Sequence, residues 1–432
     1  MTDPLGPSQP LKILTLDGGG LQAISTLLIL NKLLEKIAQE SGVPACRKPR
    51  PCDVFDTIAG IGAGGWLAIL LGRFRMDITT CLSEWYEIMQ CIAPKSKTEE
   101  LRLRLLRHCY FDTERLVERV DSLTRTHGTG DRLFHPYTSG ARTRHVFVAA
   151  LTSDAKGYSL FRSYEIPDSA KLPEKLLEGP KDPSNFEIRR AFGVTGAARY
   201  FSNPWEEEMA SSGKTSFNDT KFPKPHNITR LALDEMWGIY GSDVPLSVVV
   251  NIGPGLPTDS DVKQIARRFP WGLKPYPPLE ATPTREARSL IVPNSPTDSV
   301  EQDIKRTQDG SHDHLPEQPQ LNKHSPEGSR NRSAAPTKPF ASVKDRGIDA
   351  ELKRLEDDIE IDIKNNLSNI CPGTSNLYYR LAPAQAPQGT PQNDFSTSGV
   401  ALNATMAYLS EPPVDATMNE IVKRILGLVS DS

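Results

Sequence analysis

Residues 54–65 read VFDTIAGIGAGG, and this stretch predicts how the chain folds. Val54–Ala59 (VFDTIA) predicts a strand that enters Gly60-Ile61-Gly62-Ala63-Gly64-Gly65, and a helical pattern follows from Trp66 to Arg73. Glycines flanking one central residue permit the sharp strand-to-helix turn of the nucleophile elbow, G-x-S-x-G, in which the central residue stands above the sheet. Here the central residue is Gly62, which has no oxygen that could attack a carbonyl. The sequence therefore predicts an elbow, shaped by Gly60, Gly64 and Gly65, without its nucleophile.

The same order of strand, glycine turn and helix occurs nearer the N-terminus. Leu11–Leu16 (LKILTL) predicts a buried strand, Asp17-Gly18-Gly19-Gly20 follows it, and Ile24–Gln39 has apolar residues at helical spacing. Backbone N–H groups of Gly18, Gly19 and Gly20 can converge on an anion or on the oxyanion of acyl transfer. A glycine turn without a ligand fits these residues equally well. The dinucleotide fingerprint and the phosphate-loop pattern are both absent from the sequence.

The repeated order predicts an α/β fold with a mostly parallel sheet and helices on its faces. Further strands are expected at Arg144–Leu151, Leu160–Ile166, Leu246–Ile252 and Leu377–Leu381. Further helices are expected at Ser83–Ile92, Thr98–Leu123, the first half of Asn185–Phe201, Leu231–Tyr240, Ile348–Ile370, Leu402–Leu409 and Asn419–Val429.

Composition divides the 432 residues into four parts. Residues 1–10 form an N-terminal tail, and residues 11–256 form the α/β domain. Residues 257–345 are rich in proline, serine and charge, which predicts a disordered insertion. Residues 346–432 return to apolar periodicity, and we expect them to complete the same domain.

Several segments, in one order, resemble the motifs of patatin-like phospholipases. That family has D-G-G-G-x-R-G after its first strand and F-D-x-I-A-G-T-S-T-G-G at its elbow, and residues 17–23 and 55–65 are similar to these two motifs. Other similar segments are Leu160–Tyr164 (LFRSY), Gly193–Phe201 (GVTGAARYF), Arg230–Trp237 (RLALDEMW), Ser247–Gly255 and Tyr379–Leu381. The resemblance implies a three-layer patatin-like fold with helices on both faces of a mostly parallel central sheet. It also implies descent from lipid acyl hydrolases.

The family is a set of serine–aspartate dyad enzymes, and the chain departs from both members of the dyad. Gly62 occupies the serine position. Asp219 is the candidate for the dyad acid, but Thr220 and Lys221 replace the glycines that follow the aspartate in the family's D-G-G turn. The remaining departures are Gln22 for the loop arginine, Ala23 for the glycine after it, and Ile228 for the proline of N-N-P. No intact catalytic residue is therefore expected. Ser25, on the helix after the glycine loop, is interpreted as a helix-face hydroxyl.

Charge and cysteine content exclude other classes. A net charge of −3 without a concentrated basic face argues against a nucleic-acid binder. The six cysteines show no C-x-x-C spacing and no histidine at zinc-site distance, so neither a metal nor another cofactor is expected. The first ten residues do not resemble a signal peptide, and no apolar run is long enough to span a bilayer, which predicts a cytoplasmic protein. Peripheral membrane contact stays open, and Arg102, Arg104 and Arg107 are candidates for it, although a solvated helix face is the plainer interpretation.

Three functions follow as hypotheses. The first is an inactive patatin-like domain that binds lipid or fatty acid, or serves as a regulatory module. The second is a weak lipid acyl hydrolase with a non-serine mechanism, in which Asp219 holds an attacking water. The third is a protein-interaction or effector module whose partner binds residues 257–345.

Overall fold

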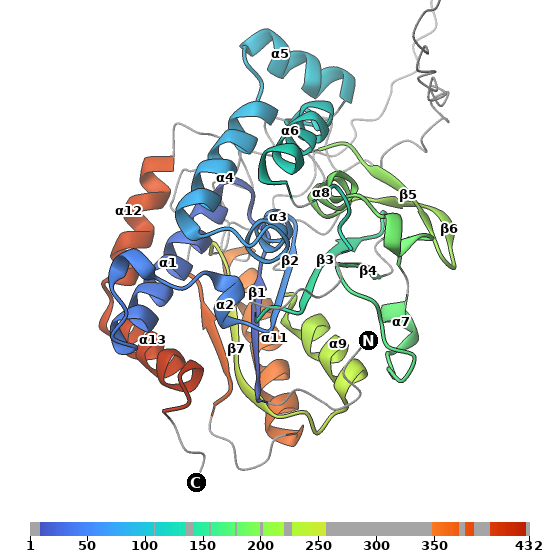
Figure 1. The fold of residues 1–432 in the computed structure, drawn as a ribbon. Helices are drawn as coiled ribbons and strands as arrows, with labels where there is room; N and C mark the ends of the chain where they lie inside the picture. Colours follow the sequence, from blue (N-terminus) through green and yellow to red (C-terminus); the bar gives the residue numbers. More distant parts are fainter. Residues whose placement is uncertain are drawn as a thin grey trace, which may run out of the picture. The chain divides into compact units, whose positions relative to one another are not determined.

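A six-stranded sheet, ordered β4-β3-β2-β1-β7-β8, forms the centre of the computed structural model (Figure 1). The model describes residues 9–107, 109–128, 130–134, 142–154, 157–177, 179–198, 202–219, 227–255, 348–370, 376–383 and 398–428. The sheet strands are β1 (Leu11–Leu16), β2 (Thr57–Ile61), β3 (His145–Leu151), β4 (Tyr158–Arg162), β7 (Leu246–Ile252) and β8 (Tyr378–Leu381). All neighbours pair in parallel except β4, which is antiparallel to β3. The predicted α/β fold with a mostly parallel sheet is confirmed. The insertion predicted for residues 257–345 lies outside the described residues.

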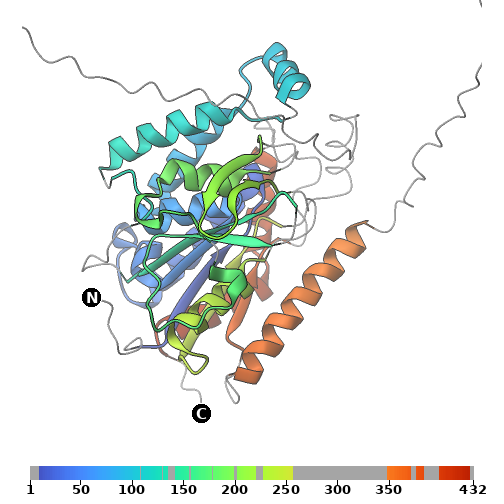
Figure 2. The same ribbon diagram turned by 90° about the vertical axis from the view of Figure 1, so that its right-hand side faces the viewer.

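Apolar side chains alternate between the two faces of the sheet. On β1, Leu14 and Leu16 belong to one buried cluster, and Leu11 and Ile13 belong to another. The first cluster is covered by α1 (Ala23–Glu40), α3 (Ala63–Ala68), α4 (Ile78–Ile92), α6 (Thr113–His127), α8 (Ile188–Gly196) and α13 (Pro412–Ile425). The second is covered by α9 (Thr229–Tyr240) and α11 (Ile348–Ile370), and Figure 2 shows α11 along that side. The sheet is therefore the middle of three layers, as period-two burial of strands on both faces requires.

The remaining elements are short or lie at the edges of these layers. They are η1 (Gly20–Gln22), η2 (Ala45–Arg47), α2 (Pro51–Val54), the π turns η3 (Ile69–Arg73) and η4 (Leu103–Arg107), α5 (Lys97–Arg102), α7 (Glu174–Leu177), η5 (Pro183–Asn185) and α12 (Ser398–Leu409). A separate antiparallel hairpin pairs β5 (Trp205–Met209) with β6 (Gly213–Phe217). α12 and α13 lie beside α1 (Figure 1), so elements at opposite ends of the chain share one layer.

The expectation of one helix over Thr98–Leu123 is wrong. The helical segment of α5 and η4 ends at Arg107, and α6 starts at Thr113. Asp112 starts α6 as its N-cap, because its carboxylate accepts the N–H groups of Glu114 at 3.0 Å and Arg115 at 3.3 Å. The apolar spacing continues through the break, so periodicity alone could not show it.

Two other sequence expectations also differ from the structure. The second strand starts at Thr57 rather than Val54, because Pro51 opens α2 and the Asp53 carboxylate accepts the N–H of Arg50 at 3.2 Å at the start of that helix. The β5–β6 hairpin was not expected, since Trp205–Met209 (WEEEM) has no alternating apolar pattern. Its buried Glu207 is instead satisfied by an ion pair with Arg190.

A buried ion pair ties β4 to α9. Arg162 donates from Nε to Glu235 Oε1 at 2.6 Å and from Nη2 to Glu235 Oε2 at 2.8 Å. Arg162 Nη2 also donates to the carbonyl of Leu176 at 2.6 Å, and the Tyr164 hydroxyl donates to Glu235 Oε1 at 2.8 Å. The Glu235 side chain has 0% exposure, so it relies entirely on these donors. The LFRSY segment, Leu160–Tyr164, thus holds β4 against α9 through the pair of Arg162 and Glu235.

We expect Arg162→Met to lower the free energy of unfolding by about 3–5 kcal/mol, because it leaves the Glu235 carboxylate buried without its cation. The double variant Arg162→Met/Glu235→Leu should be clearly more stable than this single variant, because it buries no unpaired charge. Urea unfolding followed by circular dichroism measures both. A double variant at least as unstable as the single variant would contradict this account.

His145, at the start of β3, is a buried imidazole held between two tyrosines. Its ring lies edge-on to Tyr164 and Tyr240, with centroids 4.6 Å and 5.6 Å away. Burial, with a smaller contribution from the nearby Arg144 charge, lowers the pKa of His145 to about 3. The folded state therefore binds this proton much less readily than the unfolded state, where histidine titrates near 6.5.

Because the folded pKa of His145 is depressed, its contribution is neutral above about pH 6.5 and destabilises the fold as the pH falls below that value. From pH 7 to pH 5 we expect this residue to lower the free energy of unfolding by about 2 kcal/mol. The measurement is urea unfolding of wild type and His145→Gln at both pH values. The wild type should lose more stability than the variant, and parallel losses would disprove the assignment.

Candidate functional site

The elbow is present at the carboxyl end of β2. Gly62 has φ 57° and ψ −130°, a backbone conformation that residues other than glycine rarely adopt. Its carbonyl accepts the N–H groups of Gly65 at 3.0 Å and Trp66 at 3.2 Å, which opens α3. Its own N–H donates to Thr195 Oγ1 at 3.0 Å, and that hydroxyl donates to the Ala149 carbonyl at 2.7 Å. Thr195 therefore links the elbow to β3 through α8.

The glycines around the elbow are required by close packing. A Cβ on Gly60 would lie 2.1 Å from the Gly64 carbonyl oxygen, and a Cβ on Gly64 would lie 2.2 Å from the Leu16 carbonyl oxygen. A Cβ on Gly65 would lie 2.5 Å from Thr195 Oγ1. These clashes explain why three glycines persist around a turn that lacks its nucleophile.

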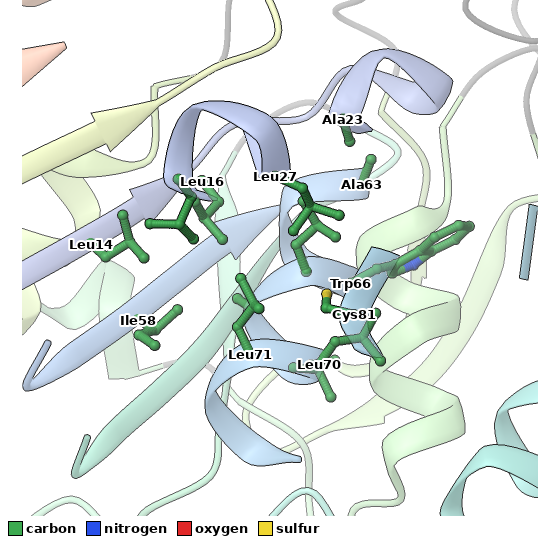
Figure 3. Close-up of a cluster of buried hydrophobic side chains, with 14 of the residues drawn as sticks. Leu14, Leu16, Ala23, Leu27, Ile58, Ala63, Trp66, Leu70, Leu71 and Cys81 are labelled. Carbon is green, nitrogen blue, oxygen red and sulfur yellow. The ribbon is translucent and has the colours of Figure 1, made fainter. Parts of the chain in front are cut away.

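The first turn of α3 also helps to build the core. Figure 3 shows Ala63 beside Leu27 and Ala23, with the Trp66 ring at the edge of the same buried cluster. Trp66 stacks on Phe192 with ring centroids 5.7 Å apart. The indole N–H of Trp66 donates to the Phe192 carbonyl at 2.8 Å, so this tryptophan holds the first turn of α3 against α8.

Gly62 differs from the neighbouring glycines because its side-chain direction has room. Among the described residues, a Cβ built on Gly62 meets only Gly18 Cα, at an ordinary contact distance of 3.4 Å. The missing side chain would therefore start directly beside the glycine loop. Glycine contributes no side-chain atom to this space.

The glycine loop lies against this position and leaves its amides available. Within the part of the chain that the structure describes, the N–H groups of Gly18, Gly19 and Gly20 donate to no acceptor. A Cβ on Gly19 would lie 2.1 Å from Pro254 Cγ, and Gly20 has φ 56°. Three glycines thus let the backbone pass between the elbow and Pro254 with its N–H groups unoccupied.

Asp17 holds the loop from below. It is 3% exposed, its Oδ1 accepts from Asn251 Nδ2 at 3.0 Å, and its Oδ2 lies 2.6 Å from Arg380 Nη1. Arg380 on β8 also donates to Asn251 Oδ1 on β7, and its Nε lies 3.6 Å from Glu360. The aspartate of the DGGG motif is therefore a positioning residue that joins β1, β7 and β8. The sequence did not reveal this, although the Tyr379–Leu381 motif already contained the partner arginine.

Asp219 lies at the same edge of the sheet as Gly62. Its N–H donates to the Ala197 carbonyl at 2.8 Å, two residues beyond Thr195, which holds the elbow. The N–H of Asn218 donates to the Leu151 carbonyl at the end of β3. Burial, with a smaller contribution from the Asp219 carboxylate, raises the pKa of Tyr158 to about 12. Tyr158 is a neighbour of the candidate acid that sequence reasoning missed, because an aromatic residue at a strand start carries no distinguishing signal.

The structure separates the other candidates from the elbow. Ser25 is fully buried, and its Oγ lies 2.7 Å from Thr405 Oγ1 of α12, so it packs α1 against α12 as a helix-face hydroxyl. Thr220 and Lys221 lie outside the described residues. Across the described ranges, no three histidine, cysteine, aspartate or glutamate side chains are grouped closely enough to hold a metal ion.

With this geometry in view, comparison with known proteins identifies the domain. Residues 14–228 match the family model of patatin-like phospholipases. This part of the chain belongs to the patatin-like phospholipase family. The elbow, the glycine loop and strands β2, β3 and β4 lie within the matched residues, whereas β7 and β8 lie beyond them.

Two relatives agree with the family but cover only parts of longer proteins. The chain is 28% identical over 160 residues to Patatin-like phospholipase 1 of Plasmodium falciparum, covering 37% of this chain and 21% of that protein. It is 39% identical over 75 residues to Phospholipase A I of Arabidopsis thaliana, covering 17% of this chain and 5% of that protein. The chain thus shares with them the patatin-like domain, or a part of it, rather than their whole length.

We expect Gly62→Ala to remain folded and to cost about 1–3 kcal/mol of unfolding free energy, since the added methyl finds space and only the positive φ opposes it. Gly60→Ala should cost clearly more, because its methyl would overlap the Gly64 carbonyl. Thermal and urea unfolding of the two purified variants compare these costs directly. If Gly62→Ala were the more damaging change, the elbow geometry described above would be wrong.

Proposed function

We propose that this patatin-like domain has lost serine–aspartate ester hydrolysis and binds the carboxylate or carbonyl head of a lipid at its glycine loop. The observation that carries the proposal is Gly62 itself: the elbow conformation is intact, and no side chain fills the nucleophile position. A nucleophilic acyl transfer requires an oxygen at that point, and glycine has none.

The binding half of the proposal rests on backbone groups. Oxyanion stabilisation uses N–H donors that do not depend on side-chain identity. The amides of Gly18, Gly19 and Gly20 keep this capacity, and Asp17 holds their loop in place. A site that binds a tetrahedral oxyanion can also bind a carboxylate, because both present negative oxygens to the same donors.

Local space also favours a ligand at this point. The open side-chain direction of Gly62 faces Gly18, so a ligand oxygen can occupy the volume that a serine side chain would fill. Ligand binding without turnover is the function that these features support together, and a regulatory role would follow from occupancy by lipid.

Fatty-acid release from mixed phospholipid and neutral-lipid vesicles tests the loss of hydrolysis. We expect wild type and Asp219→Ala both to give background rates. Wild-type release that Asp219→Ala abolishes would overturn the proposal, and would favour the weak hydrolase in which Asp219 activates water.

A fluorophosphonate that labels activated serines gives a second readout on the same site. Wild type should take no label, whereas Gly62→Ser should be labelled above Gly62→Ala, because the elbow would again present an oxygen beside the oxyanion donors. Labelling of wild type would show that another nucleophile is active.

Binding of oleate, followed by tryptophan fluorescence or calorimetry, tests whether the glycine loop binds a lipid head. Gly62→Asp would place a carboxylate beside the glycine-loop amides, so we expect it to weaken oleate binding about tenfold or more relative to Gly62→Ala. The alanine variant controls for the strain that any side chain causes at this φ. Equal affinity in the two variants would place the ligand elsewhere.

A further inference from the structure

An exposed apolar and basic surface lies on the helical segment formed by α5 and η4. Leu101, Leu105 and Leu106 are 52%, 48% and 71% exposed. Leu103, in the same segment, is 5% exposed and anchors it to the domain. Figures 1 and 2 both show α5 beyond α4 and α6, clear of the central sheet. The three exposed leucines therefore form a surface that no described element covers.

The acidic residues of this segment are already paired with arginines of the protein. Glu99 pairs with Arg115 on α6 and accepts the N–H of Lys95 at 2.6 Å, and Glu100 lies 3.7 Å from Arg104. The interaction with Arg115 and the Lys95 N–H lowers the pKa of Glu99. The negative charge of the segment is thus directed toward cations that the fold itself provides.

Three other basic residues in or just before this segment are exposed to solvent. Lys95, Lys97 and Arg102 are exposed, and among the described residues their side-chain nitrogens form no ion pair. Three exposed cations therefore lie close in sequence to three exposed leucines, and the charge of Lys95 also acts on Glu99. Basic residues beside exposed apolar side chains are the pattern of a helix that lies in the interface of an anionic bilayer.

Exposure of an apolar side chain does not by itself indicate a membrane. On α11, Ile361 is 55% exposed, but Asp357, Asp358, Glu360 and Asp362 surround it in sequence. An anionic surface would repel that helix and attract the α5–η4 segment. This contrast favours a bilayer with negative headgroups as the occupant of the leucine surface.

We infer that the α5–η4 segment is a membrane-docking surface, with Leu101, Leu105 and Leu106 inserted at the headgroup boundary and Lys95, Lys97 and Arg102 against anionic lipid headgroups. Apolar insertion and headgroup attraction each contribute to the affinity, so binding depends on both the leucines and the ionic strength. The inference does not depend on the lipid site at the glycine loop, because the α5–η4 segment can bind a membrane whether or not a lipid occupies that loop.

Co-sedimentation of the full chain with vesicles tests this inference, using phosphatidylcholine alone and phosphatidylcholine mixed with phosphatidylserine. Wild type should bind the mixed vesicles better, and added salt should weaken that binding. Leu101→Ser/Leu105→Ser/Leu106→Ser and, separately, Lys95→Gln/Lys97→Gln/Arg102→Gln should each lower the partition coefficient about tenfold or more. Ile361→Ser is the matched control and should bind as wild type does.

The same experiment separates this surface from the proposed lipid site and from a protein partner. The leucine triple variant should lose vesicle binding and keep its affinity for oleate, because its leucines lie outside the glycine-loop site. Unchanged vesicle binding by the leucine triple variant would overturn the inference. A second result would also overturn it: wild type binds no vesicles but self-associates in sedimentation velocity, and the triple variant does not self-associate. The leucines would then contact a second copy of the chain.

Discussion

The contact between two glycine-bearing turns is the constraint on which the rest of the site depends. Adjacent parallel strands β1 and β2 end at the same edge of the sheet, and the chain turns sharply after each. Gly64 lies so near the Leu16 and Asp17 carbonyls that a Cβ there would be 2.2 Å and 2.5 Å away. Only backbone can fill this space, so α3 reaches its place against β1 only when the elbow keeps its glycines.

The groups that hold the site are distinct from the groups that would perform chemistry. Asp17, Asn251 and Arg380 hold the glycine loop, and Thr195 holds the elbow; none of these contacts needs a reacting substrate. A glycine at position 62 is therefore compatible with all of these contacts. This is why family membership shows the fold and the ancestry, whereas hydrolysis has to be argued from the site itself.

Charge pairing within the domain also shapes its outer surface. Glu99 pairs with Arg115 on α6, whereas Lys97 and Arg102 of the α5–η4 segment are exposed. Net composition conceals this, since the chain as a whole carries a charge of −3. The distribution of paired and unpaired charges, rather than their sum, determines which face can approach an anionic partner.

Local patterns in the sequence were enough to predict the sheet, its mostly parallel order and both glycine turns. Buried strands, glycine spacing and the absent oxygen at Gly62 are properties of consecutive residues, which explains why they were readable. The single helix expected over Thr98–Leu123 was wrong because apolar spacing continues across a break that only the Asp112 cap reveals. The β5–β6 hairpin was missed because Glu207 is buried through a partner on another element.

The sequence by itself determined the glycine-rich turn, the absence of a side-chain oxygen at Gly62 and the α/β class, since each depends on residues adjacent in the chain. Only the tertiary structure decided that Asp17 anchors the loop through Arg380, 363 positions away, and that the Gly62 side-chain direction opens onto Gly18. It also decided which leucines of the α5–η4 segment stay exposed. The physical reason is that burial and charge pairing depend on contacts between elements that are distant in the sequence. Local periodicity does not encode those contacts.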